Sequence, residues 1–109
     1  MPDVNARDAR IAFADLPWED QMEGMRVKRF ERDGKTIRLV EFSDTFVEPG
    51  WCEKGHSGLV LKGALWLEFA NGRKEWLQEG DGLYVPAALE GRHKAVVPSG
   101  RALLLLVDA

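Results

Sequence analysis

The sequence has 109 residues, of which 45% are hydrophobic and 30% are charged, with a net charge of −3. A chain of this length buries one core and not two, so we expect a single globular domain, and the limited stability of so small a domain favours a homodimer. The 15 basic and 18 acidic residues are interspersed, which excludes the concentrated basic surface of a nucleic-acid-binding protein, and no apolar run approaches the roughly 20 residues that span a membrane.

Residues 1–24 are polar, are interrupted by two prolines, and contain one short apolar stretch, Ile11–Leu16. We therefore predict an N-terminal arm over residues 1–24, followed by a β-barrel domain over residues 25–109. The apolar stretch can add an edge strand to this barrel or to that of a neighbouring copy, and Trp18 can anchor the arm.

From Met25 onward, short runs rich in Val, Ile, Leu, Phe and Trp are separated by turn residues, at the spacing that is typical of a sandwich or barrel. Asp33-Gly34 and Asn71-Gly72 predict tight hairpin turns, because these dipeptides tolerate positive φ angles. No segment after residue 25 has the periodicity of an ordinary helix. The predicted strands cover residues 26–32, 35–42, 64–69, 73–77, 83–86 and 101–107.

Within residues 64–69, the apolar side chains of Leu65, Leu67 and Phe69 fall on one face, which we expect to be core. Glu68 falls on the other face, beside Trp66, and is expected to be solvated. The later breaks at residues 80–82 and 98–100 are rich in glycine, and we interpret them as corners of the barrel and not as phosphate-binding loops, because strands and not helices follow them.

The sequence has two histidines and one cysteine, and all three lie near predicted turns. Cys52 and His56 belong to residues 50–56, and His93 ends the turn segment of residues 90–93. Side chains at strand ends reach a cavity readily, so these are the candidate binding groups. A single cysteine cannot form an internal disulfide, and the start of the chain lacks a secretory apolar run, so the cytoplasm is the expected compartment.

The segments 53–63 and 80–93 together resemble the two motifs of the cupin family. Val60-Leu61-Lys62-Gly63 matches the strand end of the first motif, and Gly80-Asp81, Pro86 and His93 match the second. The sequence is thus similar to small single-domain cupins of the type-2 conserved barrel group, over roughly residues 36 to 107. The resemblance implies an all-β, antiparallel jelly-roll barrel with a metal at its mouth.

The ligand set departs from the usual three histidines and one glutamate of the family. His56 occupies the position of the glutamate, Cys52 that of the second histidine and Gly50 that of the first, whereas His93 matches. The resemblance implies a divalent metal on Cys52, His56 and His93, and a thiolate with two imidazoles suits Zn²⁺ or Fe²⁺. The alternative is a pair of hydrogen-bonded histidines without metal, with Cys52 as a small buried side chain.

Trp51, Tyr84 and Glu90 are the candidates for the wall of a substrate pocket. Trp51, with Trp66 and Trp76, can stack on a ring or sugar, but aromatic residues in strands more often belong to the core or to a dimer contact. For Glu90, a role as acid or base and a solvated loop position remain equally open.

Two functions follow from these residues. The first is a small-molecule enzyme that uses a divalent metal on the three candidate ligands. The second is a metal-free module that binds a small molecule or sugar in the same pocket, as a sensor for example. A barrel that serves only assembly is a third possibility. The sequence assigns no catalytic residue and no substrate.

Overall fold

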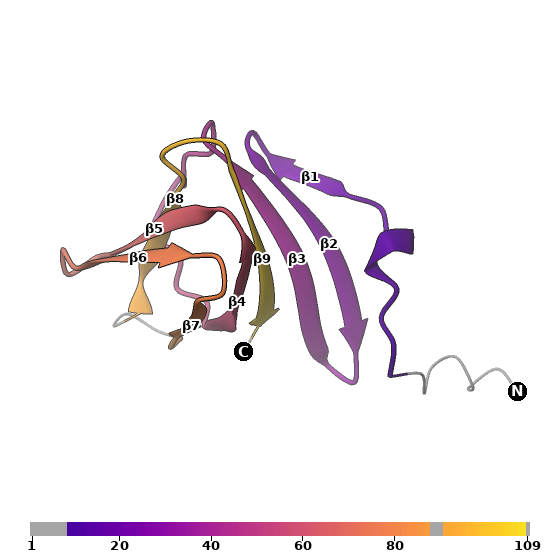
Figure 1. The fold of residues 1–109 in the computed structure, drawn as a ribbon. Helices are drawn as coiled ribbons and strands as arrows, with labels where there is room; N and C mark the ends of the chain where they lie inside the picture. The colour runs from indigo at the N-terminus through magenta and orange to yellow at the C-terminus, as the bar shows by residue number, and fades with distance from the viewer. Residues whose placement is uncertain (1–8, 88–90, 109) are drawn as a thin grey trace, which may run out of the picture.

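The computed structural model describes residues 9–87 and 91–108, and it consists almost entirely of antiparallel strands (Figure 1). Two sheets pack face to face: a six-stranded sheet with the order β1-β2-β3-β9-β4-β7 and a three-stranded sheet with the order β6-β5-β8. The antiparallel β-barrel predicted from the sequence is confirmed. The strands are β1 (Glu19–Met22), β2 (Met25–Arg32), β3 (Lys35–Ser43), β4 (His56–Lys62), β5 (Ala64–Phe69), β6 (Lys74–Gln78), β7 (Gly82–Val85), β8 (His93–Val96) and β9 (Arg101–Asp108).

Both predicted hairpins form. β2 and β3 pair along their whole length, and the two residues between them, Asp33 and Gly34, have φ angles of 54° and 74°. Only a residue that tolerates the left-handed region allows so short a connection, which explains the Asp-Gly dipeptide. β5 and β6 also form a hairpin, but four residues, 70–73, connect them, and of these only Gly72 has a positive φ, 92°.

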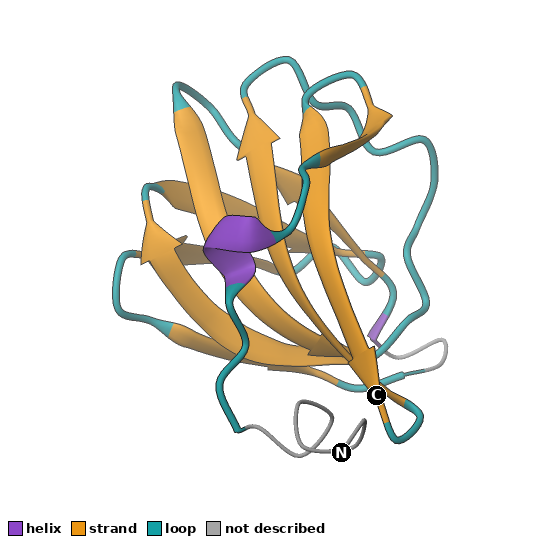
Figure 2. Cartoon of the chain, turned by 90° about the vertical axis from the view of Figure 1, so that its right-hand side faces the viewer, coloured by secondary structure: helices purple, strands orange, loops and turns teal. Residues whose placement is uncertain are grey.

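The N-terminal segment forms an edge strand, but at a different place from the expected one. The strand is β1, which pairs with β2, whereas Ile11–Leu16 contains the 3-10 turn η1 (Phe13–Asp15). This turn lies in front of the large sheet in Figure 2, where Lys28 Nζ donates a hydrogen bond to the carbonyl oxygen of Phe13 at 2.7 Å. Trp18 packs under the cations of β2, with Arg26 Cζ 4.4 Å from its ring centre. Residues 1–8 lie outside the described part.

The core lies between the sheets and follows the alternation of the strands. Every second side chain points inward, as Val27 and Val40 do from β2 and β3 and Leu65 from β5, each at most 1% exposed. The prediction that Trp66 and Trp76 belong to the core or to a pocket is wrong for both. They lie on the outer face of the small sheet, 37% and 42% exposed, because their positions alternate with the inward-pointing leucines.

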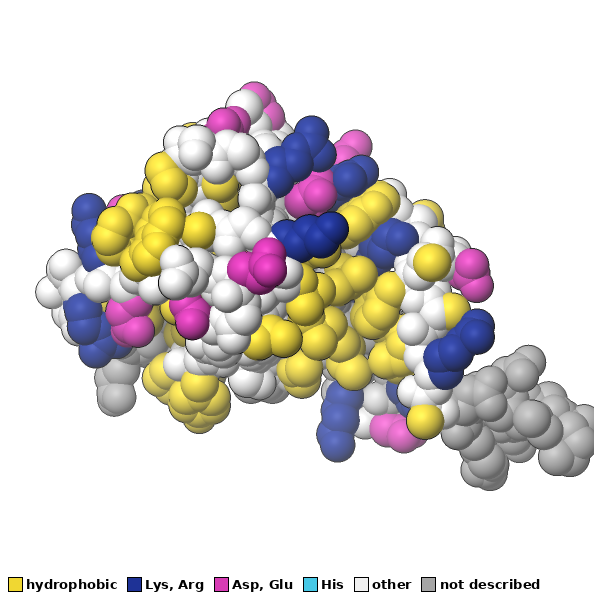
Figure 3. Space-filling model, viewed as in Figure 1, with side chains coloured by type: hydrophobic (Ala, Val, Ile, Leu, Met, Phe, Trp, Pro, Cys, Tyr) yellow, Lys and Arg dark blue, Asp and Glu magenta, His cyan; other side chains and the backbone are white. Residues whose placement is uncertain are grey.

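The small sheet covers only part of the large one, and β1, β2 and β3 extend beyond it (Figure 1). The space-filling view shows apolar side chains exposed beside Lys and Arg side chains in this region (Figure 3). The interior of the barrel is therefore open at this side. Within the described part of the chain, no helix has the length and apolar character to cross a membrane.

Candidate metal centre and cavity

A cavity of about 250 Å³ lies between the two sheets. Its wall is mostly apolar and comes from both sheets, with side chains that include Phe42, Leu65, Leu67, Leu77, Leu83, Leu104 and Leu106. Its polar side chains are fewer: Gln21, Arg29, Arg38, Glu48, Cys52, Lys54, His56 and His93. An apolar pocket with a few converging polar groups is the usual form of a small-molecule site, and this volume holds on the order of eight atoms the size of a water molecule.

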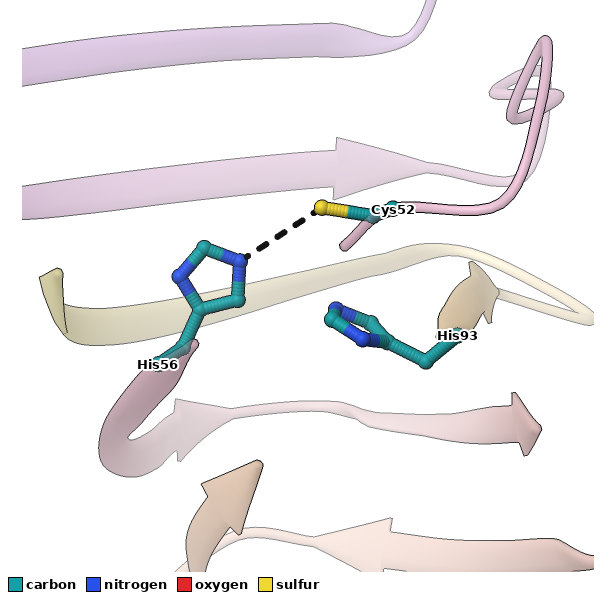
Figure 4. A group of neighbouring side chains, drawn as sticks. All are labelled: Cys52, His56 and His93. Atoms are coloured by element: carbon teal, nitrogen blue, oxygen red, sulfur yellow. Dashed lines mark hydrogen bonds between the residues drawn. The ribbon is translucent and has the colours of Figure 1, made fainter. Parts of the chain in front are cut away.

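The three candidate ligands come together at this cavity. One donor atom from each of Cys52, His56 and His93 lies within 4.8 Å of the others. His56 begins β4 in the large sheet and His93 begins β8 in the small sheet, so the packing of the two sheets brings the imidazoles edge to face, with 5.4 Å between their ring centres. Figure 4 shows both rings and the sulfur of Cys52 pointing toward a common space.

Main-chain hydrogen bonds hold Cys52 in place. Its N–H donates to the carbonyl oxygen of His93 at 2.9 Å, and its own carbonyl oxygen accepts from the N–H of His93 at 3.1 Å. This isolated antiparallel bridge ties the long connection between β3 and β4 to the start of β8. Two of the three candidate ligands are therefore positioned relative to each other by the backbone alone.

Hydrogen bonds also determine which nitrogen of each histidine is free. His93 Nδ1 lies 2.7 Å from the carbonyl oxygen of Gly91, and His56 Nδ1 lies 3.0 Å from Oδ1 of Asp108. Both partners can only accept, so both Nδ1 atoms carry the proton and both Nε2 atoms keep a lone pair. Nε2 of His56 faces the sulfur of Cys52 at 3.8 Å, from which it accepts a weak hydrogen bond.

Asp108 on β9 and Arg38 on β3 add two charged side chains next to His56. Asp108 lies directly opposite His56 in the pairing of β9 with β4, and its Oδ1 also accepts from Nη2 of Arg38 at 2.8 Å. Burial by itself raises the pKa of Asp108, but the hydrogen bond and charge of Arg38, with a smaller contribution from His56, outweigh it and hold this pKa below 3.8. Asp108 is therefore an anion that orients the imidazole.

Burial lowers the pKa of His56 below 6.5. The hydrogen bond to Asp108 raises it by a smaller amount, and the charge of Arg38 lowers it further. His56 is only 8% exposed, so removal of solvent from the charged form is the main cause. The neutral imidazole that results at pH 7 is the form that binds a metal.

Glu48 is a carboxyl group of the cavity wall that the sequence did not single out. Its Oε1 accepts the N–H of Ala95 at 3.0 Å, and burial raises its pKa above 4.5, with smaller opposing contributions from that hydrogen bond and from the charges of His93 and Lys94. A half-buried carboxyl group beside an apolar cavity is a candidate acid or base.

Of the three predicted pocket residues, Trp51 and Tyr84 do not join this group. Tyr84 is 79% exposed, because it alternates on β7 with the inward-pointing Leu83 and Val85. Trp51 is 41% exposed and points outward next to Cys52, where Lys94 Nζ lies 4.6 Å from its ring centre. Neither side chain lines the cavity, and Glu90 lies outside the described residues.

Two residues of the site, Arg38 and Asp108, were missed although the sequence carries a signal for both. Arg38 shares a face with Val40 and Phe42, and Asp108 shares one with Leu104 and Leu106, as a period of two requires. A charged residue at an inward position of an apolar strand needs a partner or a ligand. The alternation of each strand therefore indicates both residues.

No protein-family model matches the sequence, and no curated protein matches it. Solved structures do match. A cupin 2 conserved barrel domain protein from Salinispora arenicola has a TM-score of 0.68 at 15% identity, with 94% of this chain and 87% of that chain covered. A sugar phosphate isomerase of the cupin superfamily from Silicibacter pomeroyi has a TM-score of 0.71 at 18% identity, with 92% and 74% covered.

A third match is the iron(II) form of HppE, with a TM-score of 0.75 at 14% identity. It covers 98% of this chain, and this chain spans 63% of that one. At these identities, the likeness is one of fold.

Proposed function

The chain has the cupin fold, and we propose that it binds a divalent transition metal, Zn²⁺ or Fe²⁺, through Cys52, His56 and His93 and acts with it on a small molecule in the adjoining cavity. The observation that carries the proposal is the convergence of these three donor atoms at the cavity wall. They are the only cysteine and the only histidines of the chain, and they come from two separate segments, residues 50–56 and the start of β8.

The distances fit a metal. Zn–S and Zn–N bonds of about 2.3 and 2.0 Å place tetrahedral ligands about 3.5 Å apart, close to the 3.8 Å between Cys52 Sγ and His56 Nε2. Ligand atoms 4.8 Å apart reach the same arrangement when each side chain moves by about 1 Å or less. Both imidazoles already present a lone pair, and Asp108 bonded to Nδ1 of His56 is the usual support of a metal-bound histidine.

Three protein ligands leave coordination positions for water or a substrate, as in catalytic sites. When an ion is held by these three ligands, it supplies Lewis-acid or redox chemistry to a molecule in the cavity. The protein side chains orient the imidazoles, exclude water through the apolar wall and, at Glu48, provide a carboxyl group that can hold or release a proton. The iron(II) in the description of one structural neighbour and the isomerase activity in that of another support this type of chemistry.

Metal analysis tests the proposal directly. The protein is purified with neither a chelator nor a metal-affinity tag, assayed for bound metals, stripped with EDTA and titrated with Zn²⁺ and Co²⁺. We expect one ion per chain and, with Co²⁺, a thiolate-to-metal charge-transfer band. Cys52→Ser should remove that band, and His56→Ala or His93→Ala should weaken binding strongly. Glu53→Gln, a change in the exposed part of the same connection, is the matched control and should change nothing.

No bound metal and no uptake on titration would leave the metal-free alternative. The mostly apolar cavity wall favours that alternative as a second candidate. Its sugar-binding form has less support, because Trp51, Trp66 and Trp76 point to solvent and not into the cavity.

Two further expectations belong to the proposal. The half-exposed Trp66 and Trp76, with their ring centres 5.0 Å apart, favour a homodimer, which light scattering during gel filtration tests. A thiolate ligand at Cys52 favours the reducing cytoplasm, where the thiol stays free; localisation of a tagged protein tests that placement.

A further inference from the structure

Two arginines face each other on the inner surface of the large sheet. Arg29 on β2 lies directly opposite Arg38 on β3, and both line the cavity. Directly opposed like charges destabilise a sheet. The neighbouring inward pair on these strands, Val27 and Val40, is apolar and fully buried, so the charged pair beside it needs an explanation.

The negative charge inside the barrel is insufficient for the pair. Arg38 is 9% exposed; its Nη2 donates to Asp108, and its buried Nε has no hydrogen-bond partner. Arg29 has no ion pair with any described residue. Lys54 adds a third cation to the cavity wall. Two carboxyl groups balance these cations in part: Glu48, which lines the cavity, and Asp108, which does not line it but bonds Arg38. Three cations against two carboxyl groups leave an excess of one positive charge.

This arrangement lies next to the candidate metal ligands. Nη2 of Arg38 and Nδ1 of His56 bond the same oxygen of Asp108, so the guanidinium group and the imidazole are neighbours. Beyond them the cavity is lined by leucines. A molecule with one negative end and a short apolar body would match the charge, the volume and the walls together.

We propose that the cavity binds a small aliphatic carboxylate whose charged end lies between Arg29 and Arg38. Guanidinium groups bind carboxylates with two parallel hydrogen bonds, and a single excess positive charge selects a monoanion over a dianion. The proposal deepens the proposed function, on whose cavity it rests, by naming the class of substrate, but it does not depend on a bound metal.

Isothermal titration of EDTA-treated protein with hexanoate, hexanamide and hexyl phosphate tests the proposal. Hexanamide has the shape of hexanoate without its charge, and hexyl phosphate carries two charges near neutral pH. We expect hexanoate to bind at least about tenfold more tightly than hexanamide, the size of one charge-assisted hydrogen bond, and more tightly than hexyl phosphate. Equal affinity for the amide, tighter binding of the phosphate ester, or no binding of hexanoate below about 10 mM would each overturn it.

The variants Arg29→Gln and Arg38→Gln locate the site. Each should weaken hexanoate binding about tenfold or more and leave hexanamide binding unchanged. Arg29 is exposed, so its variant keeps the test valid even if Arg38→Gln fails to fold. Arg101→Gln, which removes an exposed arginine paired with Glu41 on the outside, is the matched control; hexanoate binding weakened as much by this change as by Arg29→Gln would refute the site.

Failure of this proposal and failure of the metal proposal are distinguishable. Zn²⁺ uptake without discrimination between hexanoate and hexanamide leaves the metal centre and removes the arginine site. Hexanoate binding that survives EDTA treatment and is lost in Arg29→Gln supports the arginine site even in a protein that takes up no metal. Hexanoate binding that requires Zn²⁺ and is unaffected by Arg29→Gln would show that the carboxylate binds the metal, and it would refute the proposal.

Discussion

Replacement of Asp108 by alanine should weaken metal binding without touching a proposed ligand. Oδ1 of Asp108 accepts from His56 Nδ1 at 3.0 Å and from Arg38 Nη2 at 2.8 Å, and its side chain is 20% exposed. The variant loses a charge-assisted hydrogen bond worth about 1.5–3 kcal/mol and leaves the cation of Arg38 beside the imidazole. Both effects disfavour a bound cation, so the Kd for Zn²⁺ should rise about 10- to 100-fold.

Competition with a fluorescent zinc indicator measures this Kd in EDTA-treated protein reloaded with Zn²⁺. Asp108→Asn, which keeps an acceptor oxygen but loses the charge, should fall between the wild type and Asp108→Ala. Asp44→Ala, which removes only the hydrogen bond from Gly100 in an exposed turn, is the matched control. A folded Asp108→Ala protein whose Kd differs from the wild type by less than about twofold would refute the role of Asp108 in orienting His56.

Three further predictions follow from the burial of His56 and Leu65 and from the outward orientation of Tyr84. In EDTA-treated protein, the pKa of His56 is lower in the folded than in the unfolded chain, so the unfolded chain takes up a proton first as the pH falls. The free energy of unfolding therefore keeps its full contribution from His56 above pH 6.5 and decreases as the pH falls toward the lowered pKa. Urea unfolding at about pH 7.5 and 5.5 should show this decline, and His56→Gln should reduce it; an equal decline in the variant would contradict the assignment. Leu65→Ala, at a site 1% exposed, should lower the free energy of unfolding by about 2–5 kcal/mol in urea titrations, and a loss below about 1 kcal/mol would contradict its place in the core. Tyr84→Phe should change neither the Zn²⁺ Kd nor the hexanoate Kd, because its phenol is 79% exposed outside the cavity; a change in either above about fivefold would contradict that placement.

The fold was predictable because its signals are local. The Asp33-Gly34 dipeptide determines a two-residue turn, and the alternation in residues 64–69 determines which side chains of β5 point inward, and both predictions are confirmed. The edge strand was misplaced because β1, Glu19–Met22, is exposed at every position. Its strand conformation comes from pairing with β2 and not from an apolar pattern.

The site was predictable only in part. The motif positions indicated that Cys52, His56 and His93 would share a cavity, and the structure brings them together. The pocket predictions for Trp51 and Tyr84 rested on residue type. Alternation along β7 directs Tyr84 to solvent, and Trp51, in the connection before β4, also points outward. The contacts of Arg38 with Asp108 join residues 70 positions apart, and such a contact depends on the order of strands in the sheet, which the sequence alone did not provide.

The bridge between Cys52 and His93 is made by N–H and carbonyl groups, and every amino acid except proline has both. Its geometry is therefore indifferent to which side chain stands at position 52. During divergence, a barrel of this kind can exchange one donor atom for another at that position while the peptide frame keeps its shape. A thiol at Cys52 can thus stand where the cupin motif has a histidine, with no rebuilding of the surrounding loop.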